Sequence, residues 1–409
     1  MRILMVNKFL YPNGGSETYV FELGAYLKRI GHDVQYFGME HPKRCVGNAV
    51  NAYTATMDFH AAKGMAKIGY ALKTIYSTEA RKKLRLVLDD FKPEVVHLNN
   101  FNYQLTPSMI VEIVKWKRET GNPCRVVFTA HDFQLICPNH QLFNPGQGKV
   151  CEKCVGGHFL NCVKGKCIHG STLRSFLGFC EASYWNGRNI YRHLDAVICP
   201  SQFMKRKMDT NPALAPKTVF LRNFTGRKEE KPIDTSVLQN LPPRYVLYFG
   251  RFSTEKGIAT LLSAAEALKD IPFVFAGNGP LKARVDAVSN IRNMGFLSGG
   301  ALNGVISGAA FSVIPSEWYE NCPYSIIESM MLGTPVLGAT IGGIPELIRN
   351  GQDGELFESG NVEDLKARIQ GLWSDEARIK RYRESCMETG FDTVAEYAQK
   401  LMPIYGQSI

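Results

Sequence analysis

The sequence has no uninterrupted apolar run of the roughly 18 to 20 residues that a bilayer-spanning helix needs. Its first residues, 1–8, hold only a few apolar side chains before a charge, too few for the apolar core of a signal peptide. There is no short repeat and no low-complexity tract, and 45% hydrophobic with 21% charged residues excludes a collagen-like or largely disordered chain. We therefore expect a cytoplasmic globular protein, with room in 409 residues for two or three domains.

Positive charge is unevenly distributed along the chain. Residues 1–225 contain 30 Lys and Arg against 16 Asp and Glu, a balance of +14, whereas the remainder contains 18 against 22, a balance of −4. A basic half is compatible with nucleic acid, an anionic membrane surface or an anionic substrate. No helix-turn-helix, RNA-recognition or standard zinc-finger pattern is present, and the basic residues lack interleaved aromatic platforms, which disfavours nucleic acid.

Two basic segments, 63–73 and 81–85, lie next to apolar helical faces. They could dock on an anionic membrane surface, or they could be ordinary solvated faces of helices. The first interpretation predicts a peripheral association with the inner face of the membrane, and the sequence leaves both open.

Short β-branched runs alternate with longer amphipathic stretches through most of the chain, which is the pattern of βαβ units and a parallel sheet. In the first half, strands are expected at 3–6, 34–37, 95–98, 126–129, 197–199 and 219–221. The second half restarts the pattern, with strands expected at 245–249, 273–276, 291–296, 311–314 and 336–338. The fold class is therefore α/β, with two doubly wound, Rossmann-like domains.

A polar stretch at 229–235, followed by Pro242 and Pro243, separates the two series of strands as an interdomain connection would. We place the first domain at 1–225 and the second at 226–385. The last segment, 386–409, carries Val394, Tyr397 and Leu401 at helical spacing, and we expect this helix to pack back on the first domain.

Glycine-containing turns follow several of the expected strands and open helices. They contain Gly14 and Gly15, then Gly250 with Arg251 and Lys256, then Gly277 and Gly279. Such turns let the backbone approach a ligand closely, and two cations beside a helix N-terminus suit a diphosphate. Open α/β sheets bind ligands at the carboxyl ends of their strands, where these turns lie. Neither the G-x-G-x-x-G nor the Walker order is present, and each turn alone could be a plain turn or solvated surface charge.

The segment 315–336 carries two glutamates, Glu320 and Glu328, eight positions apart. Pro323 is suited to begin a helix, which places Glu328 inside a stretch rich in Ile, Met and Leu. Because burying an unpaired carboxylate is costly, a functional role is favoured over two surface glutamates. One carboxylate before the helix and one within it could grip a small polyol from two levels.

A cysteine-rich insertion, 133–170, follows the strand that precedes His131. It has little apolar material of its own, and its cysteines after Cys137 are Cys151, Cys154, Cys162 and Cys167. Four thiolates that begin with C-x-x-C suit a tetrahedral structural zinc, although the later spacing is not a standard finger pattern. Free thiols or a disulfide remain the alternatives.

The Glu320 and Glu328 pair resembles the E-x7-E motif of retaining family 4 glycosyltransferases of the bacterial surface-polysaccharide type. These enzymes have the GT-B fold, in which two Rossmann-like domains face each other across a cleft. The resemblance covers nearly the whole chain in family order and includes the segments 14–17, 93–97, 129–132, 250–257, 277–280 and 342–346.

The resemblance implies roles for individual residues. Arg251 and Lys256 would hold the donor diphosphate, and Glu328 would bind the nucleotide ribose. Glu320 would face the transferred sugar and phosphate, and His131 would contact the donor sugar, with a purely structural histidine as the alternative. Further donor contacts would come from Gly14, Gly15, Gly250, Gly277, Gly279, Asn321, Cys322, Pro323, Tyr324 and Ser325.

The implied activity is that of a nucleotide-sugar-dependent hexosyltransferase that retains the anomeric configuration. It would move a sugar to a glycan or lipid-linked acceptor in cell-surface polysaccharide biosynthesis, with a UDP-sugar as the first expectation for the donor and a GDP-sugar as the next. Catalysis would need no cofactor, because side-chain cations and helix N-termini would stabilise the departing diphosphate. The alternatives are a non-transferring relative, such as an epimerase or phosphorylase, and a zinc-containing nucleic-acid-binding protein; the E-x7-E spacing favours transfer.

Overall fold

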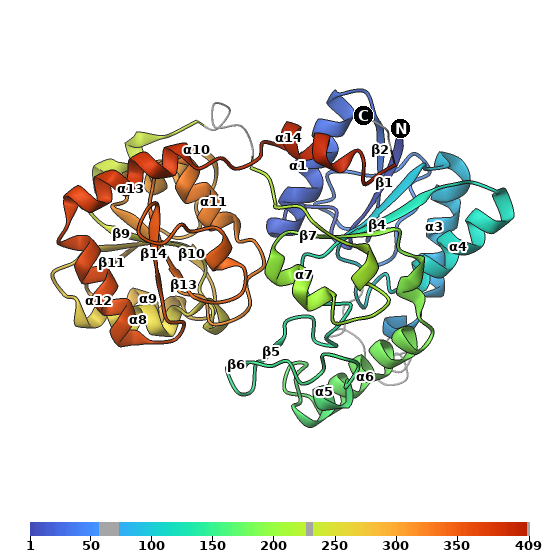
Figure 1. Ribbon diagram of the computed structural model, residues 1–409, viewed down its shortest axis with the longest axis horizontal. Helices are drawn as coiled ribbons and strands as arrows, with labels where there is room; N and C mark the ends of the chain where they lie inside the picture. The colour runs from blue at the N-terminus through green and yellow to red at the C-terminus, as the bar shows by residue number, and fades with distance from the viewer. Residues whose placement is uncertain (57–72, 226–231, 407–409) are drawn as a thin grey trace. The chain divides into compact units, whose positions relative to one another are not determined.

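The computed structural model describes residues 1–56, 73–225 and 232–406, and the chain divides into two compact units (Figure 1). Unit 1 comprises Met1–Gln147, Cys151–Asn223 and Val394–Ile409, and unit 2 comprises Gly148–Val150 and Phe224–Thr393. The sequence predicts domain boundaries at 225/226 and 385/386, whereas the two compact units meet along the chain at 223/224 and 393/394. The second boundary falls later because helix α13, Glu376–Glu388, packs on helices α11, Tyr324–Met331, and α12, Val362–Trp373, of unit 2.

The sheet of unit 1 has six parallel strands in the order β2-β1-β3-β4-β7-β8. They are β1 Arg2–Val6, β2 Asp33–Phe37, β3 Val95–Leu98, β4 Arg125–Thr129, β7 Ala196–Cys199 and β8 Thr218–Phe220. The order runs outward from β1 to β2 on one side and from β3 onward on the other. The direction of winding therefore reverses between β1 and β3, which is where open α/β sheets bind ligands.

Figure 1 shows the helices of unit 1, several of which flank this sheet. They are α1 Gly15–Arg29, α3 Thr78–Phe91, α4 Ser108–Thr120, α5 Leu160–Lys164, α6 Thr172–Gly187, α7 Gln202–Met208 and α14 Val394–Leu401, with 3-10 turns at Ile190–His193 and Ala215–Lys217. The short strands β5 Phe143–Asn144 and β6 Lys149–Val150 lie in the cysteine-rich insertion. The C-terminal helix α14 packs against α1, and Tyr397 of α14 hydrogen-bonds to Tyr19 of α1 at 2.7 Å.

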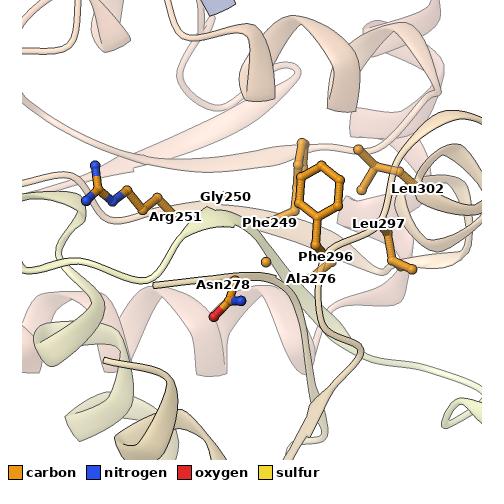
Figure 2. Close-up of a pocket in the computed structure, with 9 residues that line it drawn as sticks. Phe249, Gly250, Arg251, Ala276, Asn278, Phe296, Leu297 and Leu302 are labelled. Atoms are coloured by element: carbon orange, nitrogen blue, oxygen red, sulfur yellow. The ribbon is translucent and has the colours of Figure 1, made fainter. Parts of the chain in front are cut away.

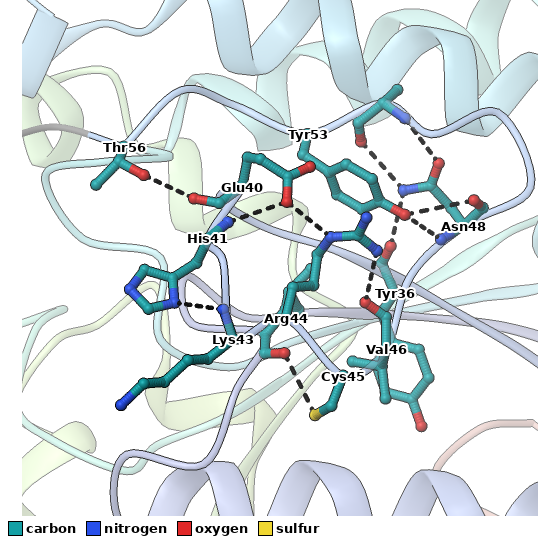
Figure 3. A network of polar contacts seen from close by, with 12 residues as sticks. Tyr36, Glu40, His41, Lys43, Arg44, Cys45, Val46, Asn48, Tyr53 and Thr56 are labelled. Carbon is teal, nitrogen blue, oxygen red and sulfur yellow. Dashed lines mark hydrogen bonds and ion pairs between the residues drawn. The ribbon is translucent and has the colours of Figure 1, made fainter.

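Polar contacts rather than regular secondary structure organise the segment that follows β2 (Figure 3). Arg44 Nε lies 3.0 Å from Glu40 Oε1, and its guanidinium covers the ring of Tyr53. The Asn48 amide donates to the backbone oxygens of Tyr36 and Ala52. These bonds satisfy buried polar groups that a loop would otherwise leave unpaired.

The sheet of unit 2 also has six parallel strands, in the order β11-β10-β9-β12-β13-β14. They are β9 Val246–Arg251, β10 Phe273–Asn278, β11 Ile291–Asn293, β12 Phe311–Ile314, β13 Val336–Ala339 and β14 Gly354–Phe357. Here the winding reverses between β9 and β12.

Alternate residues of the central strand β9 pack in two separate hydrophobic cores in unit 2. Val246 and Tyr248 of β9 pack in one core with residues of α8 and α12, whereas Leu247 and Phe249 pack in the other with residues of α10. This is the period of two that a strand buried on both faces requires. The helices are α8 Ile258–Ala267, α9 Lys282–Asp286, α10 Gly299–Gly308, α11 Tyr324–Met331, α12 Val362–Trp373 and α13, with 3-10 turns at Thr235–Asn240, Thr254–Lys256 and Ile344–Glu346.

The strands predicted from the sequence all occur, with two differences in unit 2. The strand predicted at 291–296 ends at Asn293, because Asn293 Oδ1 accepts from the backbone N–H of Gly295 and Gly295 is left-handed at φ +67°. Phe296 is consequently outside the sheet and 79% exposed. Strand β14 was not predicted, because only Leu356 and Phe357 within it are large and apolar.

Part of the predicted basic surface is neutralised within unit 1. Residues 63–72 lie outside the described residues. In the segment 81–85, on α3, Arg81 pairs with Glu112 of α4 at 2.6 Å and Arg85 pairs with Glu119 at the same distance. These two arginines are therefore matched by acidic groups of the neighbouring helix. None of the helices in the described part of the chain is both long and apolar enough to cross a lipid bilayer.

Candidate functional site

The groups predicted to bind a diphosphate lie at the switch point of the unit 2 sheet. Gly250 and Arg251 end β9, and Lys256 ends the 3-10 turn that leads into α8. The loop that carries Glu320 follows β12, the strand next to β9. Because parallel strands present their carboxyl ends at one edge, these two loops meet there.

Lys256 and Glu320 form an ion pair, with Lys256 Nζ 2.6 Å from Glu320 Oε1. The same oxygen accepts from Ser316 Oγ at 2.8 Å and from Trp318 Nε1 at 2.9 Å. The Glu320 side chain is 10% exposed and that of Lys256 is 28% exposed. Among the described residues, no donor reaches Glu320 Oε2, so this oxygen can accept from a ligand hydroxyl.

The local charges keep Glu320 ionised. Burial acts to raise the pKa of this carboxyl, but the positive charge of Lys256 and the hydrogen bonds from Lys256, Trp318 and Ser316 outweigh it and lower the pKa below its ordinary value of 4.5. At neutral pH the site thus holds a fixed carboxylate beside a cation.

This depressed pKa predicts a pH dependence of stability. A carboxylate whose pKa is lower in the folded than in the unfolded state stabilises the fold above the unfolded value, and this contribution is lost as the pH falls through the folded value. We expect the difference in unfolding free energy between wild type and Glu320→Gln to be constant from pH 6 to 8 and to shrink below about pH 4.5. Urea unfolding across this range measures it, and a difference that grows toward acid pH would contradict the assignment.

Gly342 fixes the backbone beside Glu320. Its φ is +60°, and a Cβ there would lie 2.3 Å from the carbonyl oxygen of Glu320, which also accepts from the N–H of Gly343 at 2.7 Å. A side chain at this position must therefore displace the loop that carries the carboxylate.

Gly342→Ala is accordingly expected to lower the unfolding free energy by more than about 1 kcal/mol and to reduce turnover. Gly351→Ala is the matched control, because Gly351 is also left-handed at φ +79° but has nothing within 4 Å of a Cβ. Equal losses of turnover in the two variants would show that backbone strain alone, and not the position of Glu320, matters. Denaturant unfolding and initial-rate assays measure both effects.

A cavity of about 300 Å³ lies beside Arg251 at the ends of β9 and β10 (Figure 2). Arg251 forms one end, and Phe296, Leu297 and Leu302 form an apolar side (Figure 2). Among the described residues, no carboxylate pairs with Arg251. Gly277 also lines the cavity, and it is constrained to glycine because a Cβ would lie 1.9 Å from the carbonyl oxygen of Gly250. The cavity offers a cation at one end and an aromatic ring at the other.

The second predicted glutamate lies where the sequence placed it. Pro323 caps α11, and Glu328 is half-buried within that helix. Cys322 is buried in an apolar core, so its thiol is not exposed to a ligand. Pro323 has no backbone N–H, so it can donate no hydrogen bond to a bound ligand.

In unit 1, the predicted residues lie along the corresponding edge of the sheet. Gly14 and Gly15 are exposed at the start of α1. The loop before them is held by Asn7, whose amide donates to Glu17 Oε1 at 2.9 Å. His131 follows β4, is half-buried, and has Nε2 2.9 Å from Asn99 Oδ1 after β3.

The predicted zinc ligands do not form a ligand set in the described residues, in which no group of three or more His, Cys, Asp or Glu is arranged to hold a metal ion. Cys154, Cys162 and Cys167 instead pack in an apolar cluster with Phe159, while Cys151 is half-buried. The cysteines are free thiols. Structural zinc stays a prediction, which metal analysis of the purified protein would test.

Four residues that shape these sites were not predicted from the sequence. Ser316 and Trp318 bond to Glu320, Phe296 lines the cavity, and Asn99 bonds to His131. Ser316 and Trp318 stand between an expected strand end and the first glutamate, which is the signal that could have found them. The sequence offers no comparable signal for Phe296, because it lies within a run that reads as strand.

Comparison with known proteins identifies the class. Residues 13–221 match the model described as Glycosyltransferase Family 4, and residues 230–390 match the model described as Glycosyl transferases group 1. The chain therefore belongs to the family 4 glycosyltransferases, with the GT-B fold.

The chain is similar over most of its length to individual proteins and to a solved structure. The chain is 24% identical over 366 residues to an uncharacterized 42.6 kDa protein in the cps region of Klebsiella pneumoniae, covering 85% of this chain and 88% of that one. It is 23% identical over 407 residues to a GDP-mannose-dependent alpha-(1-6)-phosphatidylinositol dimannoside mannosyltransferase of Mycobacterium tuberculosis, covering 94% and 90%. The Anabaena protein HepE, in complex with UDP and glucose, superposes with a TM-score of 0.68 at 15% identity and covers 99% of each chain.

Proposed function

We propose that this glycosyltransferase takes its sugar from a nucleotide diphosphate donor bound on unit 2. The observation that carries the proposal is the convergence of Arg251 and Lys256 on one edge of the sheet at its switch point, next to the start of α8. Two cations and a helix N-terminus stabilise negative charge that develops on a departing diphosphate. The UDP bound to HepE supports a nucleotide donor.

The cavity beside Arg251 suits the nucleoside. An aromatic ring as exposed as Phe296 can stack on a base, and the apolar side formed with Leu297 and Leu302 suits the rest of the ring system. The diphosphate would then extend toward Arg251 and Lys256. Glu328 would accept hydrogen bonds from the ribose, as the E-x7-E motif implies.

The resemblance to family 4 enzymes assigns a carboxylate of unit 2 and an imidazole of unit 1 to the transferred sugar. Oε2 of Glu320 can accept from a sugar hydroxyl while Oε1 stays bonded to Lys256. His131 offers a neutral imidazole, because burial lowers its pKa to about 3. Backbone around Gly14, Gly15, Gly279 and Ser325 would complete the donor contacts.

We propose transfer with retention of the anomeric configuration, as the resemblance to retaining family 4 enzymes implies. A leaving phosphate oxygen that takes the acceptor proton needs no protein base, and the protein then acts by electrostatic stabilisation. We propose a glycan or lipid-linked acceptor of cell-surface polysaccharide synthesis, which the mannosyltransferase of M. tuberculosis, named for its phosphatidylinositol dimannoside substrate, supports. The donor nucleotide is UDP in our proposal, with GDP as the next candidate.

A thermal-shift panel of nucleotide sugars tests the donor directly. A ligand that binds only the folded state raises the melting temperature, and at about 100 times its Kd it adds about 2.7 kcal/mol. We expect one nucleotide sugar of the panel to shift the transition and Arg251→Ala to abolish that shift. A radiolabelled donor assay with NMR of the product anomer then tests transfer and retention. A flat panel together with absent transfer would refute the proposal.

A further inference from the structure

The partner of His131 fixes which ring nitrogen carries the proton. Asn99 Nδ2 donates to the backbone oxygen of Val6 at 3.4 Å and to that of His97 at 3.3 Å. Because the amide nitrogen faces these two carbonyls, the amide oxygen faces His131 Nε2, 2.9 Å away. A carbonyl oxygen can only accept a hydrogen bond, so His131 Nε2 must be the protonated nitrogen.

The other nitrogen of His131 is left as an acceptor. An imidazole protonated at Nε2 and neutral overall carries a lone pair on Nδ1. Burial lowers the pKa of His131 to about 3, which keeps the ring neutral at physiological pH. Among the described residues, no side chain bonds to Nδ1, and His131 is only half-buried, so a ligand can reach it.

Packing fixes the plane of the same ring. Tyr19 of α1 meets His131 edge to face, with ring centroids 5.0 Å apart. The Tyr19 hydroxyl is bonded to Tyr397 of α14 at 2.7 Å and to Thr129 at 3.2 Å. The C-terminal helix therefore holds Tyr19, and Tyr19 limits rotation of the imidazole.

Most of the titratable groups around His131 keep one charge state near neutrality. Burial raises the pKa of Tyr19 to about 12, and burial together with the neighbouring His131 lowers that of His97 to about 3. Burial also raises the pKa of Asp132, the next residue, to about 6, against the opposing effect of Lys8. Between pH 5 and 8, only Asp132 of this group changes charge.

We propose that Asn99 is a positioning residue that holds His131 as the neutral Nε2–H tautomer, so that Nδ1 accepts a hydrogen bond from a sugar hydroxyl. This inference rests on the proposed function, which gives His131 its sugar ligand. A protonated imidazole has no acceptor and would force the hydroxyl to turn its lone pair toward the ring. Asn99 thus decides the direction of the hydrogen bond.

Asn99→Asp tests the proposal because a carboxylate beside Nε2 favours the imidazolium. We expect kcat of this variant to fall about tenfold at pH 6, because the protonated ring loses one hydrogen bond to the sugar. The kcat should recover as the pH rises and the ring loses its extra proton. The wild-type enzyme should not show this rise of kcat with pH. A merely structural role would lower kcat equally at all pH values.

Asn102→Asp is the matched control. Asn102 Nδ2 lies 2.8 Å from Nδ1 of His140, another histidine whose pKa burial lowers to about 3. The substitution places the same new carboxylate beside a half-buried histidine in the same unit without touching His131. We expect no new limb in its pH profile, and the same limb in both variants would overturn the proposal.

NMR of ¹⁵N-histidine-labelled protein reads the tautomer without any substrate. The His131 signals are assigned by their absence in His131→Gln, and we expect the Nε2–H neutral form in wild type from pH 5 to 8. An Nδ1–H form or an imidazolium in wild type would overturn the inference, even if Asn99→Asp failed to fold. Failure of the proposed function is distinguishable, because it would appear as absent transfer by wild type while the NMR result still decides the tautomer.

Discussion

Lys256→Ala is expected to lower kcat by about 100-fold to 1,000-fold, the usual consequence of removing one preorganised group that stabilises developing charge. The Lys256 ammonium lies at the start of α8, at the edge of the sheet where we propose that the diphosphate departs. Its loss removes a full positive charge from a site whose other cation is Arg251. Initial rates at saturating donor measure kcat, and donor binding measured separately should fall less.

Two further lysine variants make the result specific. Lys256→Arg keeps the charge but not the shape of the ammonium, and we expect a loss between wild type and Lys256→Ala. Lys282→Ala removes a lysine of unit 2 that pairs with Asp286 and is half exposed, and it should leave kcat unchanged. If Lys256→Ala turned over at the wild-type rate, the proposal that Lys256 stabilises the departing diphosphate would be wrong.

Glu320→Ala is expected to cost both turnover and stability. The substitution leaves Lys256, Ser316 and Trp318 without their common acceptor. Removing one partner of a largely buried pair destabilises a protein by about 3 kcal/mol, and a drop in kcat of about 100-fold or more should accompany the freed lysine. Denaturant unfolding and initial rates measure the two effects.

Comparison with Glu320→Gln separates charge from shape. The amide keeps an oxygen acceptor and the volume of the side chain, so we expect most of the stability but not the turnover to return. Glu317→Gln is the control, because Glu317 lies in the same loop and its carboxylate accepts from Thr260 at 2.5 Å rather than from Lys256. If Glu317→Gln were as inactive as Glu320→Gln, the loop as a whole would matter rather than this carboxylate.

Much of the fold could be predicted because its strands are buried on both faces and read as short apolar runs. Such runs predicted β9, β10 and β12 within a residue or two at either end, and the glycines after them predicted the turns that line the edge. Strand β14 was not predicted because Leu356 and Phe357 are too short an apolar run to indicate a strand. The strand predicted to reach Phe296 was too long, because periodicity does not show that Asn293 and Gly295 turn the chain.

The residues of the candidate site could be predicted from the sequence, but the contacts between them could not. Lys256 and Glu320 were both named from the sequence, yet nothing in their spacing pairs them. They are 64 positions apart, and they meet because β9 and β12 are neighbours in the sheet. The cysteine-rich insertion shows the same limit, since the C-x-x-C spacing could not show that Cys154, Cys162 and Cys167 pack together with Phe159.

The sequence by itself determined where strands and helices form and which chemical groups stand at the strand ends, because hydrophobic period and glycine placement are local properties. The tertiary structure decided which of those groups act together. Strand order brings Glu320 to Lys256, and two backbone carbonyls turn the Asn99 amide so that His131 must keep its proton on Nε2. Protonation and pairing depend on neighbours distant in the chain, and only the folded sheet supplies them.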